Sequence, residues 1–307
     1  MIYHLKLKIL FNHFKGYINL IRPFTLLAPI IVSIAIMFSS FYYTGRTNIQ
    51  SVFWNLIIPS SLSLAILNGA SNSLNQASDF KSDMISKSYR PIPSGLVSVK
   101  EACILSIFLY ILSIYISTFI NLYFTFYVIL IAFFTVTYSI PPRMKNYLFI
   151  NQIWVAIPRG LLGVLASWSV FNHTLTLLPL TIGFISLFFI IGGSITKDIV
   201  DKEADKKNGT KTLINTFGVK KAAIISFPFL FFPFFIIPIL IQYNLIGSYL
   251  WSLTLFSIPG YFIFYLMVGD NLKSKIFENT PAWSLMYITY FLFAIFFSAL
   301  IVSNSFI

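Results

Sequence analysis

The chain has 307 residues, of which 57% are hydrophobic, 18% aromatic and only 10% charged. With a mean hydropathy of +0.83, this composition excludes an ordinary water-soluble domain and indicates a polytopic membrane protein. The formal charge of +12 could suggest a nucleic-acid partner, but the placement of the basic residues argues against one, and the single cysteine, Cys103, excludes an internal disulfide.

The first segment, residues 1–16, carries three lysines and has no small-residue cleavage site before the first apolar run. We interpret it as an amphipathic cytosolic leader that is retained, not as a signal peptide. Residues 17–303 are then the transmembrane domain.

Nine apolar runs in this domain are long enough to cross the hydrocarbon core, which takes about 18 residues of helix or more. An all-α bundle is expected, because the chain lacks the segments of alternating polarity that build a membrane barrel. The expected spans are 17–42, 52–74, 102–120, 121–139, 147–171, 175–196, 222–243, 247–268 and 281–303.

The basic residues gather on one side of these spans. Of the 21 Lys and Arg, only Arg46 lies in a loop assigned to the outside and only Arg159 lies well inside a span. This positive-inside pattern places the N-terminus in the cytosol, together with the loops after spans two, four, six and eight. With nine crossings, the C-terminus lies outside. The polar residues that could do chemistry therefore face the cytosol.

The second span ends in a polar segment in which Asn75, Asp79 and Asp83 recur every four positions. In a helix these side chains share one face. A solvated helix end would give the same pattern. The rigid sequel 89–95, with two prolines, favours a binding site in which Arg90 forms a fork for phosphate oxygens.

The loop between spans four and five contains Tyr138, two prolines, Arg143 and Lys145. A proline-rich turn with positive-inside charges is the simple explanation. The functional interpretation places all three side chains around a diphosphate. Arg159, inside span five, is a buried cation for which we expect a partner within the bundle.

A second acidic stripe follows span six, where Asp198, Asp201 and Asp205 again fall on one helical face. Several lysines follow it, among them Lys211, and most of these belong to a solvated loop. Two acidic stripes facing each other would form an oxygen cage for hard divalent cations. Adjacent carboxylates and cations suit a magnesium-bridged diphosphate.

Together these residues resemble the UbiA superfamily of intramembrane prenyltransferases, whose signatures are Asn-x3-Asp-x3-Asp and a later Asp-x3-Asp that is often preceded by another Asp. They stand here as Asn75/Asp79/Asp83 and Asp201/Asp205 with Asp198. The resemblance covers roughly residues 17–303. It implies a nine-helix bundle with a central cavity open to the cytosol and to lipid, and a polyprenyl diphosphate bound through Mg²⁺.

We assign a role to each of these residues, partly from the patterns above and partly from the resemblance, which implies two Mg²⁺ ions at the diphosphate. Metal binding is assigned to Asp79, Asp83, Asp201 and Asp205. Catalysis is assigned to Arg90, Lys145 and Asp198, where Asp198 either binds metal or acts on the proton of the acceptor. Binding of the diphosphate and its magnesium is assigned to Asn75, Tyr138, Arg143, Arg159 and Lys211.

The acceptor is left open between two classes. The 89–95 loop is similar to those of the digeranylgeranylglyceryl phosphate synthase and chlorophyll synthase branches. We expect transfer of a geranylgeranyl-type group to a glycerol-phosphate ether lipid, or to an aromatic, quinone or chlorophyllide-type acceptor. The alternatives are a terpene cyclase on the same scaffold and a transporter of cations or phosphate esters.

Overall fold

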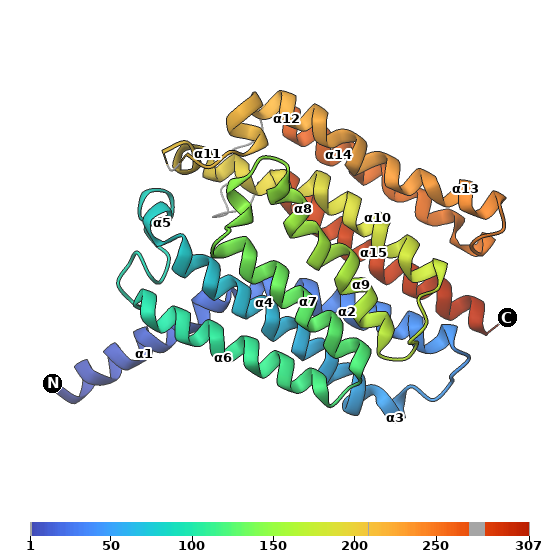
Figure 1. The fold of residues 1–307 in the computed structure, drawn as a ribbon, viewed down its shortest axis with the longest axis horizontal. Coiled ribbons are helices and arrows are strands. Elements are labelled where there is room, and N and C mark those ends of the chain that lie inside the picture. The colour runs from blue at the N-terminus through green and yellow to red at the C-terminus, as the bar shows by residue number, and fades with distance from the viewer. Residues whose placement is uncertain (1, 208, 270–279, 307) are drawn as a thin grey trace.

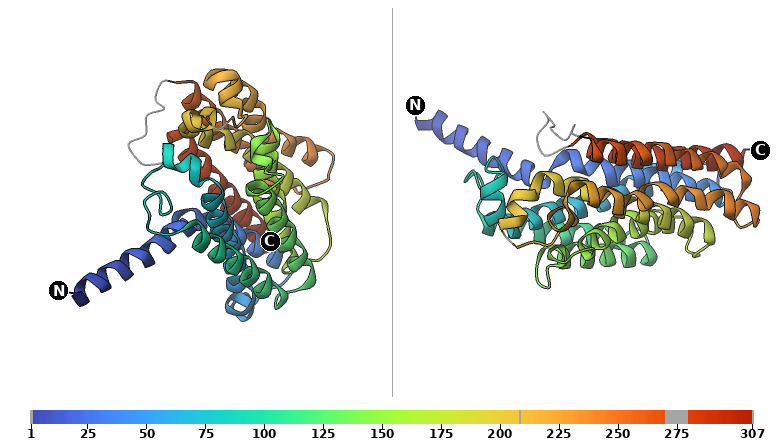
Figure 2. Two further views of the ribbon diagram at one scale, coloured as in Figure 1. Left: turned by 60° about the vertical axis from the view of Figure 1, so that its left-hand side comes forward. Right: turned by 90° about the horizontal axis from the view of Figure 1, so that it is seen from above.

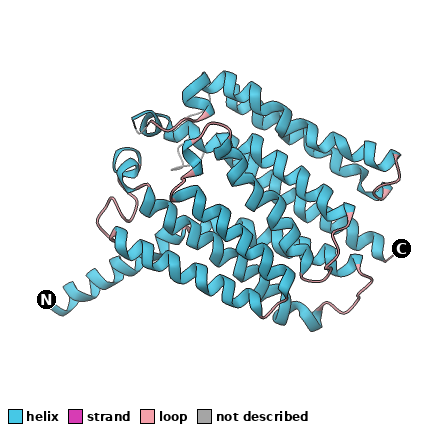
Figure 3. Ribbon diagram, viewed as in Figure 1, coloured by secondary structure: helices cyan, strands magenta, loops and turns pink. Residues whose placement is uncertain are grey.

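The computed structural model describes residues 2–207, 209–269 and 280–306. Within these ranges all regular elements are helices, which confirms the expected all-α class (Figure 3). Eight helical segments in the described residues are long and apolar enough to cross a membrane. The chain is therefore an integral membrane protein, in which long helices run side by side as one bundle (Figures 1 and 2).

The elements follow one another in chain order, with η marking 3-10 or π segments. The first half forms α1 (Ile2–Ile21), α2 (Pro23–Tyr43), α3 (Gln50–Val52), η1 (Phe53–Ile57), α4 (Ile58–Ser78), α5 (Phe80–Ser86), α6 (Val99–Thr118), α7 (Leu122–Ser139), η2 (Met144–Asn146), α8 (Ile150–Ala156), η3 (Ile157–Leu162) and α9 (Gly163–Ser169). The second half forms α10 (Leu177–Gly193), η4 (Ser194–Lys197), α11 (Asp198–Lys207), α12 (Leu213–Phe231), η5 (Phe232–Phe235), α13 (Ile236–Gln242), η6 (Ser248–Phe256), α14 (Ser257–Val268) and α15 (Pro281–Ser305).

The first crossing begins at Pro23 and not at residue 17 as expected. Helix α1 ends at Ile21, and Arg22 takes a left-handed conformation (φ 57°) before α2 begins. Proline disfavours the right-handed helical conformation in the residue before it, so the chain turns here. Helix α1 then projects away from the bundle (Figure 2). The boundary at residue 16 between the N-terminal leader and the transmembrane domain stays a prediction.

The expected fifth span, 147–171, contains a helix with an irregular middle. Helix α8, the π segment η3 and α9 follow one another without a gap. This segment is not among the eight spans that satisfy the length and hydropathy criteria, so the count of nine stays a prediction. Gly160 lies in η3, and a Cβ there would be 2.6 Å from the backbone nitrogen of Leu187 in α10. The missing side chain lets the two helices approach this closely.

Two other expected boundaries also differ in detail. Helix α12 begins at Leu213, but Gly218 has a φ of 78° and breaks it, so the continuous apolar helix starts near the expected residue 222. The basic loop expected before the last span lies mostly in 270–279, outside the described residues.

Two large hydrophobic clusters and one small cluster form the core of the described residues. One large cluster is built mainly from α10, α12, α14 and α15, the other from α4, α6 and α7, and both include residues of α2 and α9. Serine side chains bond across the closest contacts: Ser63 donates to the carbonyl of Ser113, and Ser106 donates to that of Ala70. Small polar residues allow close approach of membrane helices and bond where water is absent.

The two short helices that carry acidic residues lie at the same end of the bundle. Helix α5 follows α4, α11 follows α10, and α5 and α11 lie against each other (Figure 1). The fold therefore brings together two motifs that are far apart in the sequence.

Candidate functional site

Two adjoining cavities lead from the α5–α11 end into the bundle. The polar cavity, of about 580 Å³, is lined by the acidic motifs and many basic side chains. The inner chamber, of about 210 Å³, is lined largely by apolar side chains of α2, α4, α7 and the α8–α9 segment. The two share a set of lining residues that we call the neck: Arg22, Thr25, Asn72, Asn75, Tyr138, Arg159, Lys197 and Tyr287. The polar cavity thus opens directly into the apolar inner chamber.

All of the predicted site residues except Lys211 line the polar cavity. Lys211 is exposed and follows the turn at Gly209 (φ 69°). Its neighbours Thr210 and Thr212 line the polar cavity, but Lys211 does not. Its backbone nitrogen donates to the carbonyl of Asn146 at 3.4 Å, and its side chain is not part of the cavity wall. Its assignment to the diphosphate stays a prediction.

The first acidic stripe keeps its shared face across a break in the helix. Helix α4 ends at Ser78, and Asp79 has φ −96° and ψ 5° before α5 begins. The amide of Asp79 still bonds to the carbonyl of Asn75 at 2.9 Å, and that of Asp83 bonds to Asp79 at 2.8 Å. The four-residue spacing is preserved, and all three side chains line the cavity.

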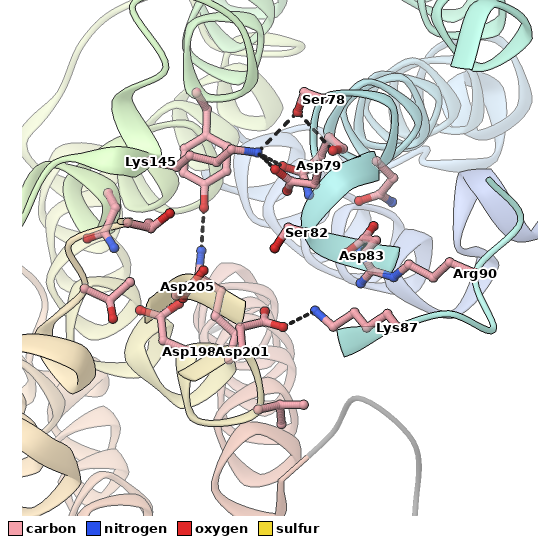
Figure 4. Close-up of a pocket in the computed structure, with 18 of the residues that line it drawn as sticks. Ser78, Asp79, Ser82, Asp83, Lys87, Arg90, Lys145, Asp198, Asp201 and Asp205 are labelled. Carbon is pink, nitrogen blue, oxygen red and sulfur yellow. Dashed lines mark hydrogen bonds and ion pairs between the residues drawn. The ribbon is translucent and has the colours of Figure 1, made fainter. Parts of the chain in front are cut away.

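Basic residues from the α7–α8 loop contact this stripe (Figure 4). Asp79 Oδ1 accepts hydrogen bonds from Arg143 Nη2 at 2.7 Å and from Lys145 Nζ at 2.6 Å, and Lys145 also donates to Asn75 Oδ1 at 2.9 Å. Burial lowers the pKa of the Lys145 ammonium to about 8, although the Asp79 carboxylate acts in the opposite direction. Lys145 is thus held inside the cavity by the same carboxylate that the sequence assigns to metal.

Asp83 forms a buried ion pair with Arg90, whose Nη1 donates to Asp83 Oδ2 at 2.7 Å. The two residues are only 3% and 6% exposed. Burial raises the pKa of the Asp83 carboxyl above its usual value, while the Arg90 guanidinium counteracts that shift. The turn after α5 therefore places a guanidinium beside the acidic stripe, and the role of Arg90 toward phosphate oxygens stays a prediction.

The second acidic stripe begins at the first residue of α11. Asp201 forms an ion pair with Lys87, which follows α5, so the two motifs are bridged directly (Figure 4). Asp198 is 5% exposed, and its Oδ2 has no hydrogen-bond partner. The pKa of the Asp205 carboxyl is raised to about 7, mainly because the group is buried and also because Asp198 and Asp201 repel its negative charge. The crowded carboxylates therefore form a local excess of negative charge.

Several cavity residues were missed by the sequence analysis. Lys87 lies four residues after Asp83, so the same spacing that identified the stripe could have found it. Lys197 precedes Asp198, yet its Nζ donates to the hydroxyl of Tyr138 at 2.6 Å. Tyr287 carried no signal, because a tyrosine in an apolar span is indistinguishable from a packing residue.

The donor set fits a hard divalent cation in its chemistry. Five Asp carboxylates and the amide of Asn75 line one cavity, and Mg²⁺ prefers oxygen ligands. The partnerless Oδ2 of Asp198 is a buried acceptor that a cation or a proton would satisfy. Within the described part of the chain, no three His, Cys, Asp or Glu side chains are grouped so that they could hold one ion. A cation bound at Asp79 or Asp201 would compete with the lysine partners of these carboxylates.

Comparison with known proteins gives a consistent picture. The sequence profile described as the UbiA prenyltransferase family matches residues 32–276. The digeranylgeranylglyceryl phosphate synthase of Methanosphaera stadtmanae is 28% identical over 260 residues, which covers 84% of this chain and 90% of the relative. A chloroplast protein of Oryza sativa, the probable homogentisate phytyltransferase 2, is 30% identical over a match that covers 67% of this chain and 56% of the length of that protein.

The fold is also found among solved structures. A UbiA homologue from Archaeoglobus fulgidus bound to GPP and Mg²⁺ superposes with a TM-score of 0.71 at 23% sequence identity. The match covers 94% of this chain and 99% of the homologue. At this level of identity the likeness establishes the shared helical fold.

Proposed function

The chain belongs to the UbiA prenyltransferase family and is a membrane-embedded transferase, and from this premise we propose that it transfers a geranylgeranyl-type group to a glycerol-phosphate ether lipid. One observation carries the proposal: a cavity rich in acids and bases adjoins an apolar chamber through a shared neck. A prenyl diphosphate is divided in the same way, into an anionic diphosphate head and an apolar prenyl tail. The acceptor class follows the relative in Methanosphaera stadtmanae, a digeranylgeranylglyceryl phosphate synthase.

In this proposal the chain crosses the membrane nine times, with the α8–η3–α9 segment as the fifth crossing. The polar cavity then opens to the cytosol. The basic residues around the cavity, such as Arg90 and Lys145, support this orientation, because cytosolic loops carry an excess of Lys and Arg.

The diphosphate head lies in the polar cavity, and its magnesium is held by Asp79, Asp83, Asp201 and Asp205 with help from Asn75. When bound, Mg²⁺ neutralises charge that develops on the leaving diphosphate. The basic partners of these carboxylates, namely Lys87, Arg90, Arg143 and Lys145, are then placed to donate to phosphate oxygens.

The reaction replaces one carbon–oxygen bond by another. The bond between the prenyl carbon and the diphosphate breaks, and the acceptor hydroxyl oxygen bonds to that carbon as it loses its proton. Asp198 is the base assigned to that proton, because its buried carboxylate has an oxygen without a partner. Apolar residues of the inner chamber, such as Leu64 and Ile131, exclude water that would otherwise capture the prenyl group.

The direct test incubates membranes containing the full chain with radiolabelled geranylgeranyl diphosphate, Mg²⁺ and candidate acceptors. We expect a prenyl ether of the glycerol-phosphate lipid, identified by mass spectrometry. Asp79→Asn and Asp201→Asn should lower turnover at least about a hundredfold, because each removes an acidic ligand and unpairs a lysine. Full turnover in either variant would contradict the metal assignment.

The same assay separates the competing functions. An aromatic acceptor, as in the homogentisate relative, would give a prenylated ring in place of the ether. A hydrocarbon or alcohol product formed without any acceptor would identify a cyclase. Movement of a substrate across proteoliposomes without a covalent product would identify a transporter.

A further inference from the structure

Two of the three cations at the neck, Arg159 and Lys197, differ from the basic residues that contact the motif aspartates. Lys87, Lys145 and Arg143 each form an ion pair with a motif aspartate. Arg159 and Lys197 form none with any carboxylate in the described part of the chain; each contacts a phenol instead. Arg159 Nη1 donates to the Tyr287 hydroxyl at 3.1 Å, and Lys197 donates to that of Tyr138.

The position of these two cations is shared by both cavities. Arg159 and Lys197 line the polar cavity and the inner chamber alike, whereas all five motif aspartates line only the polar cavity. The two positive charges also repel each other. A pair of repelling cations at the mouth of an apolar chamber is costly unless an anion joins them.

Arg159 is held at this point by an unusual piece of helix. It lies in the π segment η3, and π turns are often found at functional sites. Its carbonyl accepts a hydrogen bond from Tyr290 at 2.8 Å, and the next residue, Gly160, packs against the backbone of α10. The backbone at Arg159 is thus anchored on two sides. The side chain itself is exposed, and not buried as the sequence analysis expected.

The charge balance argues that the donor alone does not use these cations. Eight basic and five acidic side chains line the polar cavity, so its walls carry an excess of positive charge. With two Mg²⁺ ions bound, a prenyl diphosphate would carry no net negative charge to offset that excess. A second anion, brought by the other substrate, would offset it.

We infer that Arg159 and Lys197, with the hydroxyls of Tyr287 and Tyr138, form a second anion site that binds the phosphate of the acceptor. This inference rests on the proposed function, and it moves Arg159 from the donor diphosphate to the acceptor. A phosphate monoester offers three oxygens to the guanidinium, the ammonium and the phenols. The acceptor's hydroxyl then lies at the neck, beside the prenyl carbon.

The test uses a matched pair of acceptors in the full-length protein. One is a glycerol phosphate with one ether-linked prenyl chain and a free hydroxyl, and the other is the same alcohol without its phosphate. The wild type should prefer the phosphorylated acceptor at least about tenfold in kcat/KM, because it forms charge-assisted hydrogen bonds. Arg159→Gln should erase most of that preference while the KM for geranylgeranyl diphosphate changes less than about twofold.

Two further variants guard against an effect on folding. Arg159→Lys keeps the charge and should retain part of the preference. Arg46→Gln removes an arginine that lies over Phe171, outside both cavities, and should leave the preference unchanged. The inference is overturned if Arg159→Gln lowers turnover of both acceptors equally, if it raises only the donor KM, or if the wild type shows no preference.

A binding measurement separates this inference from the proposed function. In EDTA and without donor, a glycerol phosphate lipid whose hydroxyls are both alkylated should raise the melting temperature of the wild type but not of Arg159→Gln. If the wild type makes no ether product and still shows this difference, the anion site stands and the proposed function fails. If the lipid stabilises both proteins equally or neither, the anion site is refuted.

Discussion

Replacing Arg90 by Met tests whether the Asp83–Arg90 pair secures the α5 end of the cavity. The pair is almost fully buried, with exposures of 3% and 6%, and its donor–acceptor distance is 2.7 Å. Breaking a buried pair costs about 3–5 kcal/mol, because the remaining charge loses its partner. The pKa of Asp83 is already raised by burial, so Asp83 can take up a proton and limit the loss. We therefore expect the lower end of that range, about 3 kcal/mol.

Thermal unfolding in detergent with EDTA measures this effect without metal. At roughly 2–4 °C per kcal/mol, Arg90→Met should lower the melting temperature by about 6–12 °C. The matched control is Arg143→Met, which breaks a pair of the same length, but the Arg143 side chain is 36% exposed. An exposed pair contributes about 0–1 kcal/mol, so that shift should stay below about 4 °C.

The double variant Asp83→Asn/Arg90→Met adds a second check. It removes the unpaired charge and should be more stable than Arg90→Met alone. Equal shifts for the two Met variants would refute the reasoning from burial. The reasoning would also be refuted if the stability lost in the double variant equalled the sum of the losses in Asp83→Asn and in Arg90→Met.

Three further predictions follow from the geometry. Gly160→Ala should lower the free energy of unfolding by about 1–3 kcal/mol, because its Cβ would lie 2.6 Å from the backbone of α10; Gly163→Ala, whose nearest atom is 3.4 Å away, should be nearly neutral in the same thermal assay. Lys211→Ala should change kcat/KM less than about twofold, because its side chain is not part of the cavity wall, and a loss above about tenfold would restore the original assignment. Chelation should abolish transfer, and added Mg²⁺ should restore it with no change in far-ultraviolet circular dichroism, because the cation serves chemistry and not folding; activity that persists in excess EDTA would contradict this.

The sequence predicted the acidic motifs because each follows a simple spacing at the end of an apolar span. Their meeting in one cavity depended on the resemblance to a known family, since no local pattern says which helix ends are neighbours. Within the motif region, Lys87 could have been found by continuing the four-residue spacing beyond Asp83. The break at Arg22 could have been found from Pro23.

Other features were beyond reach from the sequence. The neck depends on Tyr287 and Arg159, which belong to different helices and meet only through packing. The Lys211 side chain does not line the cavity although its neighbours Thr210 and Thr212 do, and neither charge nor periodicity distinguishes these three positions. The irregular turn η3 contains Pro158, whose missing N–H indicates an interruption of the helix, but the hydropathy pattern does not show the close approach of Gly160 to α10.

The widened turn at η3 also makes the protein sensitive to a change in chain length. Because a π turn accommodates one more residue than the regular helix, deleting a single amino acid between Ile157 and Leu162 would let the segment become regular. Because the widened turn holds the extra residue, its loss would leave the helices on either side in nearly their present orientation. It would change the direction of side chains within the turn, Arg159 among them, so the loss of one codon would move this cation from its place at the neck without creating a gap in the helix.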